Sequence, residues 1–70
     1  MNWDRIAGHW KQLKGSVKQQ WGELTEDQLD VIAGKHEHLS GRIQVAYGVD
    51  KEAAEKQLAD WQKTQKNIFN

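Results

Sequence analysis

Apolar side chains recur every three or four residues from residue 3 to residue 21, and this spacing restricts the fold most strongly. The series consists of Trp3, Ile6, Trp10, Leu13, Val17 and Trp21. Side chains at these intervals share one face of an α-helix, so we expect an amphipathic helix whose first turn is split off by Gly8. The chain lacks proline, and its second half is rich in residues that favour helices. These features predict an all-α fold.

Three further helices are expected. Residues 25–28 (Thr-Glu-Asp-Gln) form a capping-box sequence and predict the start of a short helix. A third helix is expected from about Lys35 to Tyr47, and Asp50 is expected to cap a long final helix. The apolar stripe of that last helix consists of Ala54, Leu58, Trp61 and Ile68. No strand pattern or linker is present, so residues 1–70 are predicted to form a single domain.

The chain also repeats itself with an offset of 26 residues. Residues 4–22 and 30–48 share seven identities in nineteen positions, and all six glycines belong to the repeat. Two related units that bury one face against each other predict a four-helix domain of crossed helical hairpins. The equivalent pairs, Leu13 with Leu39, Val17 with Ile43 and Trp21 with Tyr47, are expected to occupy equivalent environments. Gly22 and Gly48 are expected to close the two units at positive φ.

Six apolar residues of the predicted helices are expected to form one contiguous buried cluster. They are Trp10, Trp21, Leu39, Ile43, Leu58 and Trp61. The alternative is that the tryptophans are exposed platforms on which single-stranded nucleic acid stacks. Their helical spacing among Leu and Val favours core packing, and Trp3, near the end of the chain, is the best candidate for partial exposure.

The formal net charge is zero, but its distribution is uneven. Residues 3–22 carry a net charge of +3, and residues 23–34 carry −4. We favour the interpretation that a basic and an acidic element match each other inside the fold. A basic face that binds phosphates is the alternative, and its candidate residues are Lys11, Lys14 and Lys18, which follow one edge of the first long helix. A solvated helix edge whose lysine stems cover the core is the favoured explanation of this row.

No catalytic, cofactor-binding or metal site is predicted. Cysteine is absent, and His36 and His38 are two residues apart, so on a helix they point in different directions. His9 has no acidic partner four residues away, and Ser16 and Ser40 have no patterned His and Asp partners. No apolar run approaches the ~20 residues that cross a bilayer. The first residues do not resemble a signal peptide, so a cytoplasmic protein is expected.

Three motifs stand out in the sequence: Trp-Lys-Gln-Leu-Lys-Gly at residues 10–15, Gln-Trp-Gly-Glu-Leu-Thr at 20–25, and Leu-Ser-Gly-Arg-Ile-Gln at 39–44, followed by Tyr47 and Gly48. These motifs are similar to those of the CsbD-like family, small bacterial proteins associated with the general stress response. The resemblance implies a four-helix, SAM-like fold, a cytosolic location and no catalytic residues. His36, Val45 and Ala46 depart from the family's usual charged or polar pattern on the third helix.

The resemblance therefore implies a non-enzymatic stress-response protein whose molecular activity is unknown. The hydrophilic composition favours the hypothesis that it protects other macromolecules during water loss. The first alternative is a nucleic-acid-binding module that uses the basic first helix, although the acidic loop 22–26 and the zero net charge disfavour it. The second alternative is an oligomeric or partner-binding adaptor. No membrane or cofactor is expected, and the chain is predicted to be a monomer or a weak homo-oligomer.

Overall fold

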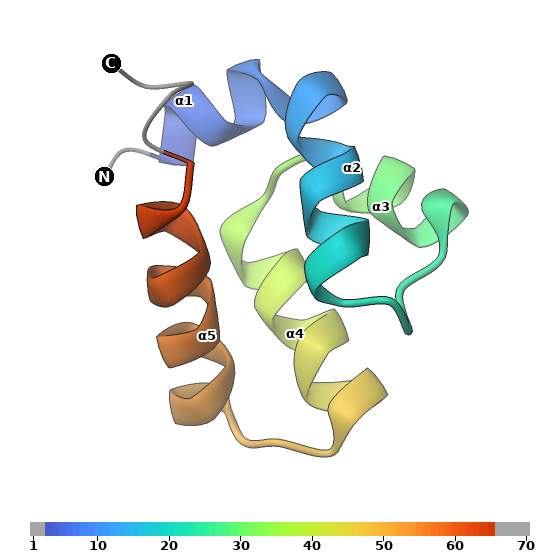
Figure 1. Ribbon diagram of the computed structural model, residues 1–70. Helices are drawn as coiled ribbons and strands as arrows, with labels where there is room; N and C mark the ends of the chain where they lie inside the picture. The colour runs from blue at the N-terminus through green and yellow to red at the C-terminus, as the bar shows by residue number, and fades with distance from the viewer. Residues whose placement is uncertain (1–2, 66–70) are drawn as a thin grey trace.

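The computed structural model describes residues 3–65, and these residues form five α-helices without a strand (Figure 1). The helices are α1 (Trp3–Gly8), α2 (Trp10–Gln20), α3 (Glu26–Ile32), α4 (His36–Tyr47) and α5 (Lys51–Lys63). α4 and α5 form an antiparallel hairpin, with α2 and α3 on the other side of α4 and α1 across the end where α5 finishes (Figure 1). The predicted all-α class is confirmed.

The expected count of four helices is wrong because the first helix divides in two at His9. The His9 amide donates to the carbonyl oxygens of Arg5 and Ile6, at 3.0 and 3.2 Å, and a new helix begins at Trp10. A break beside Gly8 was expected, and it lets α1 turn away from the axis of α2 (Figure 1). The specific arrangement of crossed, SAM-like hairpins stays a prediction.

Two helices begin with the caps that the sequence indicates. The Thr25 hydroxyl accepts from the Gln28 amide, and the Gln28 side chain accepts from the Thr25 amide, both at 3.1 Å. Asp50 accepts from the Ala53 amide at 2.8 Å at the start of α5. Each cap satisfies an amide that has no partner inside its own helix, so the short sequences around residues 25 and 50 fix where α3 and α5 start.

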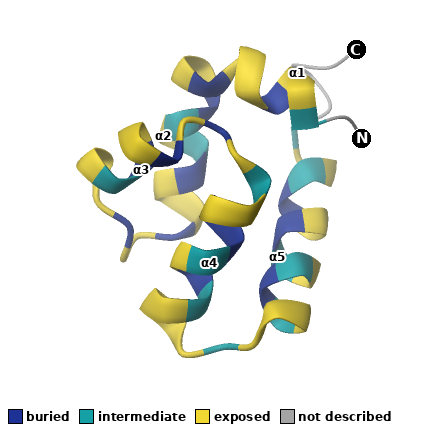
Figure 2. Ribbon diagram, turned by 180° about the vertical axis from the view of Figure 1, so that it is seen from behind, coloured by how far each residue is buried: buried dark blue, intermediate teal, exposed yellow. Residues whose placement is uncertain are grey.

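The predicted core is confirmed. All six residues expected in it are buried, and they belong to one cluster with Ile6, Leu13, Val17, Leu24, Leu29, Ile32 and Ala54. Figure 2 shows the buried stripes of α2, α4 and α5 turned toward one another. Trp3 packs against the cluster and is half-buried. Ile68, the last residue of the expected stripe, lies outside the described residues.

The two copies of the repeat agree in their middle and differ at their ends. Leu13, Leu39, Val17 and Ile43 are all fully buried. The expected match of the aromatic pair is wrong: Trp21 is 2% exposed, whereas Tyr47 is 39% exposed. The hydroxyl of tyrosine needs a polar partner, and at the surface it accepts from the Glu23 amide at 3.0 Å.

Gly22 and Gly48, which were expected to end the two copies of the repeat in the same conformation, differ in their φ angles. Gly48 has φ +63° and ends α4 in the left-handed conformation, as expected. Gly22 does not have positive φ, so that part of the prediction is wrong. The reason is that α2 ends at Trp21, whose φ of −123° and ψ of 78° lead into a turn closed by the Leu24 amide on the Trp21 carbonyl. The chain leaves α2 in an extended direction and needs no left-handed residue.

A second left-handed site lies where α1 touches the turn between α3 and α4. Ala33 and Gly34 have φ of 52° and 80°. A Cβ on Gly34 would lie 2.7 Å from the Cα of Ala7, so only glycine fits there. α1 therefore packs directly on the backbone of this turn, next to the first residues of α4.

Candidate functional site

The basic row of α2 is partly occupied by contacts within the fold. Lys14 Nζ lies 2.6 Å from Asp30 Oδ1 and 3.5 Å from Glu26 Oε1, both on α3. Lys18 Nζ donates to the carbonyl oxygen of Leu24 at 3.1 Å. Lys11 is exposed on the same helix. Two of the three candidate phosphate-binding residues are thus engaged with the segment that follows α2.

The ion pair between Lys14 and Asp30 joins the basic segment, residues 3–22, to the acidic segment, residues 23–34. The hydrogen bond to the Asp30 carboxylate raises the pKa of Lys14 above its ordinary value, helped by the charges of Asp30 and Glu26 and opposed by partial desolvation. Lys14 keeps its charge and shares it with two carboxylates. The electrostatic attraction that a phosphate would meet at this point of the helix is correspondingly reduced.

Three of the four tryptophan side chains serve the core rather than an exposed stacking surface. Their indole N–H groups have defined acceptors: Trp10 donates to the Leu29 carbonyl at 2.8 Å, Trp21 to Gln57 Oε1 at 2.8 Å, and Trp61 to Ser16 Oγ at 3.1 Å. Trp21 and Trp61 also contact each other, with ring centroids 5.9 Å apart. Each ring combines an apolar body in the core with a satisfied donor at its margin.

His36 has a structural environment that sequence reasoning missed. Its ring stacks on Trp3 with a centroid separation of 4.6 Å, and its Nε2 lies 2.8 Å from Glu55 Oε1. The contact joins α1, α4 and α5, and no spacing along the chain reveals it because Glu55 is nineteen positions away on a different helix. Its effect is to fasten α1 to the open end of the α4–α5 hairpin.

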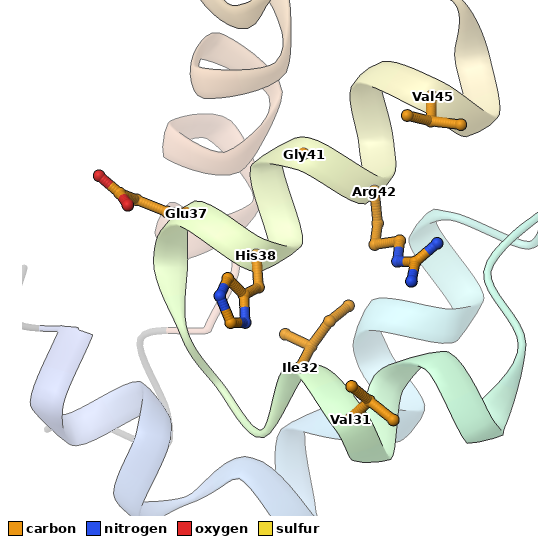
Figure 3. A pocket seen from close by; sticks show the side chains of 7 residues that line it. All are labelled: Val31, Ile32, Glu37, His38, Gly41, Arg42 and Val45. Atoms are coloured by element: carbon orange, nitrogen blue, oxygen red, sulfur yellow. The ribbon is translucent and has the colours of Figure 1, made fainter.

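Two surface hollows lie on either side of α4. The hollow between α3 and α4 has a volume of about 450 Å³ and is lined by Val31, Ile32, Glu37, His38, Gly41, Arg42 and Val45 (Figure 3). The hollow between α4 and α5 has about 320 Å³ and is lined by His36, Glu37, Ser40, Lys51 and Glu55. No pattern in the sequence indicates either hollow, although Val45 is an apolar departure from the family's usual pattern on this helix.

The serine hydroxyls take part in structural hydrogen bonds. Ser40 is 2% exposed, and its Oγ accepts from Gln44 Nε2 at 3.3 Å. Ser16 Oγ accepts from Trp61 and from Gln65 Nε2, the latter at 3.0 Å. Within residues 3–65, no three His, Asp or Glu side chains come close enough to hold a metal ion. In the same residues, no helix has the length and apolar character required to cross a membrane.

Comparison with known proteins gives one consistent result. The family model described as CsbD-like matches residues 4–56. A UPF0337 protein of Pectobacterium atrosepticum is 56% identical over 62 residues, which cover 89% of this chain and 90% of the relative. The UPF0337 proteins named YjbJ are 52% identical over 62 residues, in Escherichia coli K12 with coverage of 89% and 90%, and in Salmonella typhimurium with 89% of both chains.

Proposed function

The chain belongs to the CsbD-like family, and we propose that it is a non-enzymatic stress-response protein of the bacterial cytoplasm. It acts by its hydrated surface, which separates and protects other macromolecules when water is lost. The observation that carries the proposal is the contrast between a closed core and a polar exterior. Thirteen apolar residues are buried, and the exposed large hydrophobics among residues 3–65 are Val31, Val45 and Tyr47.

The composition supports this role. Charged residues make up 29% of the chain, both signs are present in equal number, and the mean hydropathy is −0.92. Such a surface stays hydrated and offers little apolar area to which another protein adheres. As a solution dries, partly unfolded chains then meet this surface instead of one another. Cysteine is absent, so the protein also forms no disulfides under oxidising stress.

The experiment is protection of a labile enzyme during drying. The enzyme is dried with the protein, with an equal mass of the Trp21→Ala variant, or with buffer alone, and its activity is measured after rehydration. We expect the wild-type chain to preserve several times more activity than buffer. The variant is expected to lose most of this effect because removal of a core tryptophan exposes apolar surface. Recovery equal to that in buffer would refute the proposal.

Binding of nucleic acid through Lys11, Lys14 and Lys18 is the alternative function, and the alignment of the three residues along α2 supports it. The engagement of Lys14 by α3 and of Lys18 by the Leu24 carbonyl favours the protective role instead. A labelled duplex titrated at physiological salt separates the two functions. Micromolar affinity that falls when the three lysines are changed to Gln, with a flatter salt dependence, would establish the alternative.

A further inference from the structure

Gly41 has no explanation within the protein itself. It lies in the middle of α4, where glycine is less favourable than alanine because it leaves the unfolded chain more freedom. Its φ is not positive, and a Cβ added to it would meet nothing within 4 Å. Neither backbone conformation nor packing inside the chain therefore requires glycine. Gly15 in α2 shares these properties. Gly41, however, lines a hollow together with the exposed Val31 and Val45, where a close approach of another molecule would favour glycine.

The surface around Gly41 combines apolar and charged groups. Val31 and Val45, which are 74% and 80% exposed, line the same hollow as Gly41 (Figure 3). Glu37 points to one side of Gly41, whereas Arg42 lies on the other side, toward α3 (Figure 3). The α4 face is defined here as Glu37, His38, Gly41, Arg42 and Val45. At the centre of this face Gly41 leaves the helix backbone without a side chain. Glu37 provides a negative charge on one flank, and Arg42 provides a positive charge on the other.

We propose that the α4 face binds the same face of a second copy of this chain. A two-fold axis that runs along the paired α4 helices brings the Gly41 backbones together and places the two Val45 side chains against each other. The same rotation carries Arg42 of each copy to the flank on which the other copy presents Glu37. In a symmetric dimer the same surface meets itself, so that surface must be complementary to itself. Because Glu37 and Arg42 lie on opposite flanks, Glu37 of each copy meets Arg42 of the other copy, once on each flank. Because the formal net charge of the chain is zero, two copies do not repel each other through their net charge.

The predicted dimer is weak. A stable protein–protein interface buries about 800 Å² of accessible surface on each partner. The whole accessible surface of this small protein is 4668 Å². One helix face with a single exposed valine provides less than such an interface, so we expect a dissociation constant on the order of 0.1 mM. The dimer is therefore populated only where the protein is abundant, and it buries the apolar surface that the monomer leaves open at Val45.

Sedimentation measurements across concentration provide the test, with two glycine variants as a matched pair. Gly15 lies inside α2, also lacks positive φ, and also has nothing within 4 Å of an added Cβ. Both Gly41→Ala and Gly15→Ala should raise the melting temperature of the monomer by a few degrees. Only Gly41→Ala should weaken self-association, by at least tenfold. Wild-type protein that stays monomeric at millimolar concentration, or equal effects of the two variants, would overturn the proposal.

A charge exchange tests the orientation. Arg42→Glu and Glu37→Arg should each weaken association several-fold, because each places like charges opposite each other on both flanks. The double variant should restore most of the affinity since the two pairs are re-formed with reversed sign. Single variants that associate like the wild type, or a double variant weaker than both, would show that these copies do not meet as proposed.

Discussion

The indole N–H of Trp10 donates to the backbone carbonyl oxygen of Leu29 at a distance of 2.8 Å, with Trp10 only 8% exposed. The bond joins the first residue of α2 to the middle of α3, nineteen positions away. The Leu29 carbonyl also accepts from the Ala33 amide at 3.1 Å, where the chain turns left-handed. One oxygen thus links the start of α2 to the end of α3.

Trp10→Phe tests this link. Phenylalanine retains part of the apolar contact and removes the donor, while the Leu29 carbonyl keeps its bond from Ala33. We expect a loss of about 1–2 kcal/mol in the free energy of unfolding, from urea denaturation. Trp61→Phe, which removes a bond to the partly exposed Ser16 hydroxyl, should cost less. A larger loss in Trp61→Phe would contradict the role given to the Leu29 bond.

Trp21→Ala should come close to unfolding the protein. The Trp21 side chain is 2% exposed and packs against Trp61, so its removal leaves a large cavity in a small core. The expected cost is ~3–5 kcal/mol, comparable with the whole stability of so small a domain. Circular dichroism during heating measures it. A cooperative transition near the melting temperature of the parent would show that Trp21 is not central to the core.

The glycines that precede and follow α4 should respond differently from Gly22. Gly48→Ala at φ +63° should destabilise by about 1 kcal/mol, because a Cβ is disfavoured in the left-handed region. Gly34→Ala should cost more, since its Cβ would also collide with the Ala7 backbone. Gly22→Ala has neither problem and should change stability least. The order of melting temperatures checks all three, and a Gly22 variant as unstable as the Gly34 variant would contradict it.

The Lys14–Asp30 pair should make part of the stability dependent on pH at the alkaline end. The pKa of Lys14 is raised in the folded state, so the contribution is complete below the ordinary lysine pKa of about 10.4 and is lost as pH rises through the raised value. Lys14→Gln should lower the melting temperature at neutral pH and low salt. As the pH rises through the raised pKa of Lys14, the gap between parent and variant should close. Lys11→Gln, on the exposed part of α2, serves as the control and should show no such gap.

The sequence predicts the parts of this fold that depend on local chemistry. Thr25 with Gln28, and Asp50 alone, specify helix starts through atoms a few residues apart. The spacing of Trp10 and Trp21 specifies which face is buried. Such signals are local or periodic, and they need no knowledge of how the helices pack.

The features that the sequence did not predict depend on packing between distant segments. Gly8 and Gly34 both follow Ile-Ala in the sequence, but only Gly34 has α1 against it and positive φ. The contact of His36 with Glu55, and the hollow beside Gly41, exist only because α4 lies between α5 and α3. The repeat itself overstated the symmetry, since Trp21 and Tyr47 are related in sequence but not in burial.

Survival of drying by a bacterium that lacks the gene for this protein tests the central claim most directly. The strain is supplied with the wild-type chain, with Trp21→Ala, or with the variant in which Lys11, Lys14 and Lys18 are all Gln. Protein levels and melting temperatures are measured alongside. We predict that the wild-type and triple-lysine chains restore survival equally and that Trp21→Ala restores little. Full rescue by an unfolded Trp21→Ala chain, or loss of rescue in a folded triple-lysine chain, would contradict a protective role based on the closed, polar fold.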